Sequence, residues 1–369
     1  MKARVEKIFE KLSPVPEALV IANSIEPHLD QSFFYVFDVP SGLFEGAVAI
    51  AHADGKVDLL TSPLEEESAV QATKQDPDIT IHVPKGPKER DQILTKLLPA
   101  EGSIALHNRE LTYEWFLTLQ KLLPKAQWSD ASAAIRSARM TKDADEIARL
   151  DRAAQIASKV GMEIPSMLHV GITELELAAE IEYHLSRYGA SGRSFQTIVG
   201  FGRNSAEPHY SPSDVKLEKG ANIVCDFGAL YRRYCSDITR SFRFGPVDEE
   251  MKKVHETVHA AQAAALAAIR PGVVAKDVHL AAQKVIDDSP WKGRFTHGLG
   301  HSIGLAVHDG FGMGPNADEP LEVGMAITVE PGIYLPGHGG VRIEDDIVVT
   351  KDGYRFLTTT RREYIEVPA

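Results

Sequence analysis

The chain has 369 residues, which is more than one average domain needs, so two domains are the natural expectation. Its hydrophobic share of 43% and charged share of 25% are ordinary for a globular protein. The formal net charge of −12, without a long basic run, argues against nucleic acid or an anionic membrane surface as a partner.

The N-terminal stretch "MKARVEKIFEKL" alternates charged and apolar residues and lacks the apolar core of a signal peptide. No later run is long enough to span a bilayer, so we expect a cytoplasmic protein without a membrane contact.

Residues 1–126 show alternating strand and helix patterns, which predicts an α/β N-terminal domain. Asp54-Gly55 is a hairpin turn signal, and Ser62 is expected to cap a helix that has Pro63 at its first position. No recognisable catalytic cluster occurs in this region. We expect strands at 17–23, 33–39, 46–51, 57–61, 79–83 and 103–107, and further helices at 87–98 and 110–123.

Residues 127–143 resemble a linker, and a long helix is expected from 143 to 168. A second helix then follows a capping box formed by Thr173 and Glu176. The same order of two helices, strands and glycine-rich segments returns from residue 249. This weak repeat predicts two related halves within a second domain, 144–369, although two unrelated helical hairpins would give a similar pattern.

Two cysteines, Cys225 and Cys235, are too few for a disulfide framework. If 223–238 is an alternating hairpin, their thiols point to opposite faces. We therefore expect reduced, structural cysteines.

Five residues of the second half stand out as candidates for chemistry, because four carboxylates lie in apolar, strand-like segments. A buried carboxylate is costly unless it is paired or binds a metal ion. Four carboxylates and one imidazole form an oxygen-rich ligand set of charge −4, which two divalent ions would neutralise. The five residues are Asp226, Asp237, His301, Glu330 and Glu344.

The stretch "THGLGHSIGLAVHD" at 296–309 concentrates three histidines among glycines that disfavour a helix. In an extended strand, His297 and His301 would face the same side, and the glycines between them would leave room for a substrate backbone. His308 needs a bend to reach that side, which Gly304 could supply. Because titratable clusters concentrate at active sites, we expect these histidines to line one.

With these residues in place, the chain resembles the pita-bread metallopeptidases, and among them the Xaa-Pro peptidases prolidase and aminopeptidase P. The resemblance covers about 145–365 in order and spacing, whereas the first domain matches only in size and α/β character. It implies an α+β pita-bread catalytic domain with internal pseudo-symmetry, a homodimer, and a first domain that limits substrate length. The motifs that carry it are "PHYSPSD", "DFGALYRRYCSD", "HGLGHSIGLAVHD", "VEPGIY" and "GGVRIEDD".

The resemblance implies a dinuclear metal site and assigns roles to its ligands. Asp226 would bind one ion, and Asp237 and Glu344 would bridge both. His301 and Glu330 would hold the second ion. A hydroxide between the ions would attack the carbonyl of the bond before proline, and Glu330 would pass its proton to the leaving nitrogen. Mn²⁺ suits this ligand set best, and Co²⁺, Zn²⁺ and Fe²⁺ also fit it.

The resemblance also identifies residues around the metal ligands. His209, His297 and His308 match the family's substrate-side histidines, one of which would support the tetrahedral oxyanion. Arg342, two residues before Glu344, would steady a bridging carboxylate. The expected substrates are peptides with proline at the second position.

Three departures from the family pattern bear on specificity. Ser302 replaces a common glycine, and Asp309 in "VHDGF" replaces a common glutamate. No arginine lies between His308 and Glu330, where prolidases commonly carry one for the carboxylate of a C-terminal proline. The sequence therefore leaves dipeptidase and aminopeptidase activity open.

Rival functions are an aminopeptidase of this fold without proline specificity and a non-catalytic peptide-binding scaffold. Methionine aminopeptidase usually lacks such a first domain, and creatinase lacks the metal ligands. Scaffold members typically lose ligands, so the intact set argues against that alternative.

Overall fold

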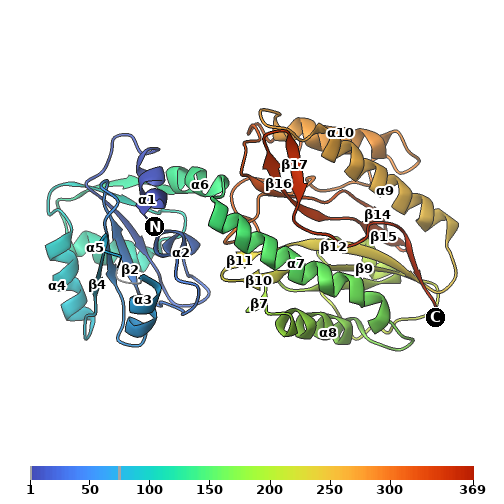
Figure 1. The fold of residues 1–369 in the computed structure, drawn as a ribbon, viewed down its shortest axis with the longest axis horizontal. Helices are drawn as coiled ribbons and strands as arrows, with labels where there is room; N and C mark the ends of the chain where they lie inside the picture. Colours follow the sequence, from blue (N-terminus) through green and yellow to red (C-terminus); the bar gives the residue numbers. More distant parts are fainter. Residues whose placement is uncertain (1, 74–75) are drawn as a thin grey trace. The chain divides into compact units, whose positions relative to one another are not determined.

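The computed structural model describes residues 2–73 and 76–369, and the chain divides into two units, Met1–Arg139 and Met140–Ala369 (Figure 1). The range 127–143, expected as a linker, holds a short strand and a nine-residue helix, α6 (Ser132–Met140). The strand is an exposed sheet edge, so it lacks the apolar alternation that would have marked it in the sequence.

Among the described residues of the N-terminal unit, six strands form one sheet in the order β4-β3-β2-β1-β5-β6. The pairs β1–β2 and β2–β3 are antiparallel, and β1–β5, β3–β4 and β5–β6 are parallel. One hydrophobic core joins this sheet to α4 and α5. The elements are α1 (Lys2–Phe9), β1 (Ala18–Ala22), α2 (Gln31–Phe37), β2 (Val48–Ala51), β3 (Val57–Leu60), α3 (Glu66–Thr73), β4 (Ile79–His82), α4 (Pro87–Leu97), β5 (Ser103–Leu106), α5 (Tyr113–Leu122) and β6 (Gln127–Asp130).

The hairpin expected around Asp54-Gly55 is confirmed, since β2 pairs with β3 and Gly55 has φ 84°. The strand expected at 33–39 is wrong, because the Asp30 carboxylate accepts a hydrogen bond from Ser32 N at 2.7 Å and starts helix α2. That helix is buried on all sides, and a continuous apolar run does not distinguish such a helix from a buried strand.

The helix expected to begin after Ser62 starts only at Glu66, so the predicted cap at Ser62 is wrong. The Ser62 carbonyl instead accepts a turn hydrogen bond from Glu65 N at 3.1 Å.

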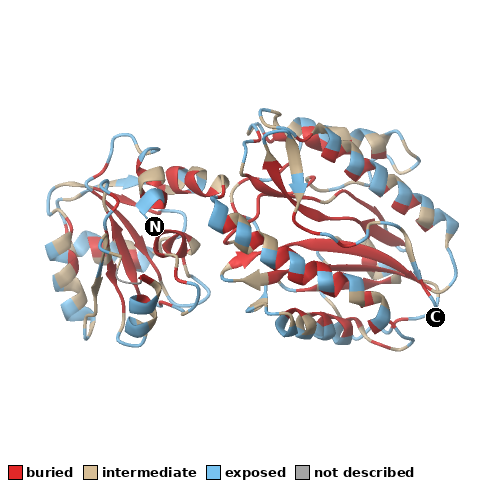
Figure 2. Ribbon diagram, viewed as in Figure 1, coloured by how far each residue is buried: buried red, intermediate tan, exposed pale blue. Residues whose placement is uncertain are grey.

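The second unit, Met140–Ala369, repeats one arrangement, a helix pair followed by a sheet. The strands of both sheets pair antiparallel, except that residues 365–367 run parallel to residues 242–244. Helices α7 (Ala144–Met167) and α8 (Glu174–Arg187) precede the sheet β18-β12-β9-β8, and α9 (Glu249–Ala268) and α10 (Ala275–Asp287) precede the sheet β13-β16-β17. The expected repeat of element order is therefore present, and Figure 2 shows the strands of this unit largely buried. The strands of these two sheets are β8 (Ile198–Phe201), β9 (Ala221–Phe227), β12 (Ile238–Phe244), β13 (Ala326–Val329), β16 (Asp345–Thr350), β17 (Gly353–Phe356) and β18 (Ile365–Val367), and the hairpin β14 (Gly332–Leu335) with β15 (Gly339–Arg342) lies between β13 and β16 in the chain. A small sheet in the order β11-β10-β7 contains β7 (Gly192–Arg193), β10 (Ala229–Tyr231) and β11 (Tyr234–Cys235).

Helix starts in this unit follow the sequence signals. Both capping-box hydrogen bonds of Thr173 and Glu176 are present at α8, and Asp143 and Glu146 form a second box at α7. Cys225 and Cys235 are free and buried, as expected.

Candidate metal centre

The five predicted ligands lie on strands and near strand ends in both halves of the second unit, Met140–Ala369. Asp226 lies in β9, and Asp237 immediately precedes β12, which pairs with β9. Glu330 directly follows β13, and Glu344 lies between β15 and β16. His301 forms an isolated β-bridge with Gly312.

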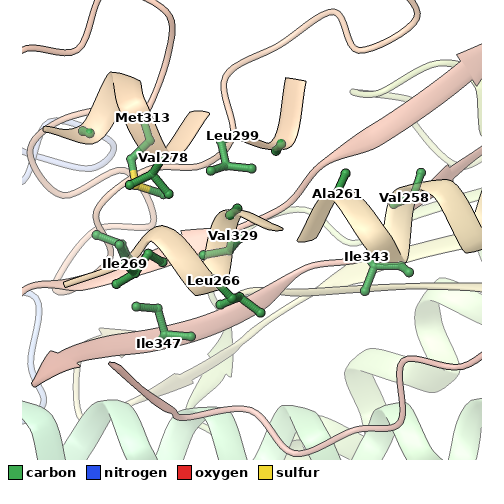
Figure 3. Packing of buried hydrophobic residues seen from close by; sticks show 14 of the residues in the cluster. Val258, Ala261, Leu266, Ile269, Val278, Leu299, Met313, Val329, Ile343 and Ile347 are labelled. Carbon is green, nitrogen blue, oxygen red and sulfur yellow. The ribbon is translucent and has the colours of Figure 1, made fainter. Parts of the chain in front are cut away.

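Buried apolar neighbours fix the direction of two of these side chains, Glu330 and Glu344. Leu299, Val329 and Ile343 belong to one hydrophobic core cluster and are fully buried (Figure 3). Each lies one or two positions from a predicted ligand. Because neighbouring side chains of extended backbone point to opposite faces, Val329 and Ile343 in the core turn Glu330 and Glu344 away from it.

The structure brings these ligand groups together. His301 Nε2 lies 3.5 Å from Asp237 Oδ2 and 3.7 Å from Glu330 Oε1. Ligand atoms of Asp237, His301 and Glu344 all lie within 4.8 Å of one another. This spacing allows one cation to contact all three residues.

Two carboxylate oxygens of the cluster are buried without a hydrogen-bond partner among the described residues, namely Asp226 Oδ1 and Asp237 Oδ1. The other oxygen of Asp226 accepts a hydrogen bond from Arg342 Nη2 at 2.6 Å. Buried polar atoms are almost always satisfied, so unpaired anionic oxygens in one cluster fit a cation. The residues present therefore fit divalent metal ions.

Electrostatics support the same conclusion. Burial and the neighbouring carboxylates raise the pKa of Asp237 and of Glu330 well above their ordinary values. The same causes raise the pKa of Glu344 to about 8. Burial lowers the pKa of His301 to about 4, so its imidazole is neutral at neutral pH, which is the form that binds metals. A bound cation would remove the repulsion between these carboxylates.

Arg342 connects the ligands to one another. In addition to its bond with Asp226, its Nε donates to Thr239 Oγ1 at 3.0 Å, and Thr239 Oγ1 donates to Glu344 Oε2 at 2.6 Å. Arg342 was expected to support a bridging carboxylate. It contacts Glu344 only through Thr239, and the carboxylate that it binds directly is that of Asp226.

The opposite end of Arg342 reaches His297. Arg342 Nη1 donates to the Tyr334 hydroxyl at 2.8 Å, and this hydroxyl lies 2.9 Å from His297 Nε2. His297 Nδ1 lies 2.8 Å from the Gly298 carbonyl oxygen. The proton is therefore assigned to Nδ1, and Nε2 accepts from Tyr334. Burial lowers the pKa of His297 to about 4, which agrees with a neutral ring.

Thr239 and Tyr334 were missed in the sequence. Thr239 could have been found from strand register, because it is the cross-strand partner of Asp226. Tyr334 lies in "VEPGIY", but its contact with two distant residues follows only from the three-dimensional fold.

The remaining predicted histidines lie around this cluster. The ring centroid of His308 lies 4.2 Å from that of His301, and both His308 and His209 are exposed. Burial lowers the pKa of His308, and His209 adds to this effect. At His297, burial, Arg342 and to a smaller extent His209 lower the pKa, so His209 lies near enough to influence both rings.

One expectation about the glycines is wrong for Gly300. A Cβ atom at this position would collide with the backbone carbonyl of Thr328. Gly300 therefore allows close packing against β13 and does not leave room for a substrate there. The segment from 297 to 300 is non-helical, as expected, but it contains bends and is not the extended strand expected to place His297 and His301 on the same side.

The fold and the cluster of carboxylates and histidine define a two-domain, metal-dependent peptidase with the pita-bread catalytic fold. Residues 148–351 match the model of metallopeptidase family M24, and residues 18–141 match that of the creatinase/prolidase N-terminal domain. The chain belongs to metallopeptidase family M24.

Known relatives and structures agree with this assignment. YkvY of Bacillus subtilis, whose name assigns it provisionally as a dipeptidase, is 38% identical over 284 residues, or 77% of this chain and 76% of YkvY. An X-Pro aminopeptidase from Thermotoga maritima superposes with a TM-score of 0.89 at 32% identity, covering 99% of this chain and 100% of that one. A prolidase from Pyrococcus furiosus gives 0.85 at 31% identity, covering 96% and 99%.

None of the helices in the described part of the chain is both long enough and apolar enough to cross a membrane.

Proposed function

We propose that this protein is a dinuclear-metal exopeptidase that hydrolyses the bond between an N-terminal residue and proline. The observation that carries the proposal is the gathering of Asp226, Asp237, His301, Glu330 and Glu344 in one buried cluster with unpaired carboxylate oxygens. Similarity to an X-Pro aminopeptidase and to a prolidase supports the choice of substrate.

In this proposal Asp226 would hold one ion, His301 and Glu330 would hold the other, and Asp237 and Glu344 would be shared by both. Bound divalent ions polarise the peptide carbonyl and lower the pKa of water, which supplies the hydrolytic chemistry. Mn²⁺ suits four carboxylates and one imidazole, and Co²⁺, Zn²⁺ and Fe²⁺ fit as well. Titrating metal-free protein with each ion, with activity and bound metal measured together, identifies the effective one.

Glu330 is the proposed proton carrier. Its Oε1 lies 3.7 Å from His301 Nε2, and its Oε2 lies 3.9 Å from His297 Nδ1. In this proposal the Glu330 carboxyl group takes up a proton and releases it to the leaving prolyl nitrogen. Burial and Glu344 raise the pKa of Glu330 in the metal-free cluster, which supports a role in proton transfer. His209, His297 and His308 are the proposed substrate-side residues. Arg342 and its partner Tyr334 keep Asp226 and His297 oriented.

Proline specificity is tested with two pairs of substrates. Hydrolysis of Ala-Pro and Ala-Pro-Ala is compared with that of Ala-Ala and Ala-Ala-Ala, using metal-loaded protein. Faster cleavage of the alanine-only peptides would favour the aminopeptidase without proline specificity. Binding of all four peptides without cleavage would favour the scaffold. The Glu344→Gln variant is the control for contaminating peptidases.

Comparing Ala-Pro with Ala-Pro-Ala also distinguishes dipeptidase activity from aminopeptidase activity. Cleavage confined to Ala-Pro identifies a dipeptidase. Because no arginine lies between His308 and Glu330, a basic residue elsewhere would then bind the carboxylate of the substrate. Preference for Ala-Pro-Ala identifies an aminopeptidase P activity, for which that missing arginine is not required.

The roles of the two domains are part of the proposal. Residues 1–126 would restrict substrate length and contribute to a homodimer, 127–143 would connect the domains, and 144–369 would carry catalysis. The proposed setting is the cytoplasm. Light scattering coupled to gel filtration measures the oligomeric state, and a mass near that of one chain would contradict the dimer.

A further inference from the structure

The loop from Ser302 to Phe311 carries His308 and is closed at its base by Ser302. Ser302 N donates to Phe311 O at 2.9 Å, and Ser302 Oγ accepts from Phe311 N at 3.1 Å. Asp309 N donates to Ser302 O at 2.9 Å. The loop is therefore a hydrogen-bonded unit in which His308 is exposed and the next residue, Asp309, is buried.

Asp309 forms a buried ion pair with Lys142, which lies between α6 and α7. Lys142 Nζ lies 3.5 Å from Asp309 Oδ2, and the exposed fractions of the two side chains are 0% and 5%. The Lys142 ammonium also donates to Met140 O at 3.3 Å. In the backbone, Lys142 N donates to Gly324 O at 2.8 Å. Lys142 is thus attached to the segment that leads into β13.

The loop is built closely around this pair. A Cβ atom at Gly304 would collide with the Asp309 carboxylate and lie 3.1 Å from Lys142 Cε. Gly310 has φ 140°, and a Cβ there would lie 2.9 Å from Ser302 Oγ. Both glycines are required by the backbone path that turns Asp309 inward and His308 outward, which explains the bend that the sequence predicts at Gly304.

A buried ion pair of this kind contributes little net stability, because the desolvation of two charges offsets their attraction. Its effect is to fix the position of the groups that carry it. His308 depends on such fixation, since its ring makes no hydrogen bond to any described residue although it lies 4.2 Å from the His301 ring, centroid to centroid.

We propose that Lys142 and Asp309 are positioning residues that hold the His308 loop against the metal centre in a geometry productive for the substrate. This inference rests on the proposed function, in which His308 faces the substrate. Since Lys142 is also attached to the segment that leads into β13, the pair ties the His308 loop to the strand that ends at Glu330.

The test is a double-mutant cycle with Asp309→Asn and His308→Ala, measured as kcat and KM on the peptide that the wild type cleaves best. Asp309→Asn is expected to lower kcat/KM between about 10- and 100-fold, because small displacements of a group at the site have such effects. In the His308→Ala background the same change is expected to have less than about a twofold effect, because coupled residues are not additive. An equal loss in both backgrounds would overturn the proposal.

Metal content and thermal unfolding are measured on every variant. Loss of activity that follows loss of bound metal would also overturn a role through His308. Lys142→Arg keeps the charge and is expected to retain most of the activity, whereas Lys142→Met is expected to lose it. Asp318→Asn is the control, because Asp318 also pairs with a lysine, Lys276, at a shorter Nζ–Oδ1 distance of 2.7 Å, but both side chains of this pair are exposed.

A second measurement does not depend on activity. Hydrogen exchange of the amides of residues 302–311 is expected to be faster in Lys142→Met than in wild type, with the exchange of β9 unchanged. Unchanged exchange in the loop would overturn the positioning role. If the wild type cleaves no Xaa-Pro peptide, the proposed function fails, and the exchange result still decides whether the pair holds the loop.

Discussion

Two adjacent carboxylates, Glu344 and Asp345, are equally buried, yet they are in opposite electrostatic states. Asp345 accepts hydrogen bonds from Arg240 Nη2 at 2.7 Å and from Arg362 Nε at 2.6 Å, and from the Thr358 hydroxyl at 2.7 Å. Burial would raise its pKa, but the charges of the two arginines outweigh burial and the pKa is lowered. Asp345 is therefore a fully compensated structural anion.

Glu344 lacks this compensation. Among the described residues its hydrogen-bonding side chain is Thr239, and burial and Asp226 raise its pKa to about 8. Burial is the same for both residues, so burial alone does not identify a functional carboxylate. Arg342 lowers the pKa of Glu344, but burial and the negative charge of Asp226 outweigh it, whereas two arginines outweigh burial at Asp345. This remaining repulsion distinguishes Glu344 and favours a metal ion beside it.

The largest effect is expected for Glu344→Gln. If Glu344 has the proposed bridging role, its loss is expected to lower activity by at least about 100-fold, which exceeds the usual effect of outer-shell partners, and to lower bound metal. The metal-free variant should be no less stable than metal-free wild type, because it lacks an unfavourable charge. Elemental analysis and peptide hydrolysis measure the effects, and full metal content would mean that the bridging role is wrongly assigned. Asp237→Asn is expected to behave alike.

Asp345→Asn is expected to lower stability and to leave metal binding unchanged, which is the opposite of Glu344→Gln. It leaves Arg240 buried without its anionic partner, which should cost about 3–5 kcal/mol of unfolding free energy. Metal bound per folded molecule should change little. Asp151→Asn is the control, since Asp151 pairs with Arg355 on the exposed surface at 2.7 Å and should cost only about 0–1 kcal/mol. Equal stability of the two variants in urea unfolding would contradict the comparison.

The sequence predicted the members of the candidate site better than their connections. Four of the five candidate ligands were selected because a carboxylate in an apolar strand is conspicuous, and His301 because of its histidine-rich segment. The α/β and repeated architectures were predicted from periodicity and element order. The link from Arg342 through Thr239 to Glu344 depends on the approach of β12 to residues 342–344, which periodicity does not fix. The role of Gly300 depends on the approach of Thr328 from another strand.

In the N-terminal unit the errors have local causes. Helix α2 is apolar on every face, so it has no helical amphipathic signal, and the cap that identifies it is the single Asp30 side chain. The signal at Ser62 and Pro63 describes a turn as well as it describes a helix start, and the structure has a turn there.

Removing the metal should make stability depend on pH through the uncompensated carboxylates. The pKa of Glu344 is about 8 in the folded protein against an ordinary value of 4.5, so the folded state binds more protons than the unfolded state between these values. Stability of the metal-free protein should therefore fall as pH rises from about 4.5 to about 8, by about 2 kcal/mol or more. Thermal unfolding after chelation measures this slope. Glu344→Gln should flatten it, and an unchanged slope in that variant would contradict the assignment.

The smallest effect is expected for Thr239→Val. The Thr239 hydroxyl donates to Glu344 Oε2 and accepts from Arg342 Nε, so it orients Glu344 while keeping its charge available to a cation. Its removal should weaken metal binding about tenfold, the lower end of the range for outer-shell partners, with little loss of fold stability. Competition with a chelator measures the affinity. Thr239→Ser keeps the hydroxyl and should bind as tightly as wild type, whereas equal weakening in both variants would mean that packing of the methyl group, and not the hydrogen bond, supports the metal site.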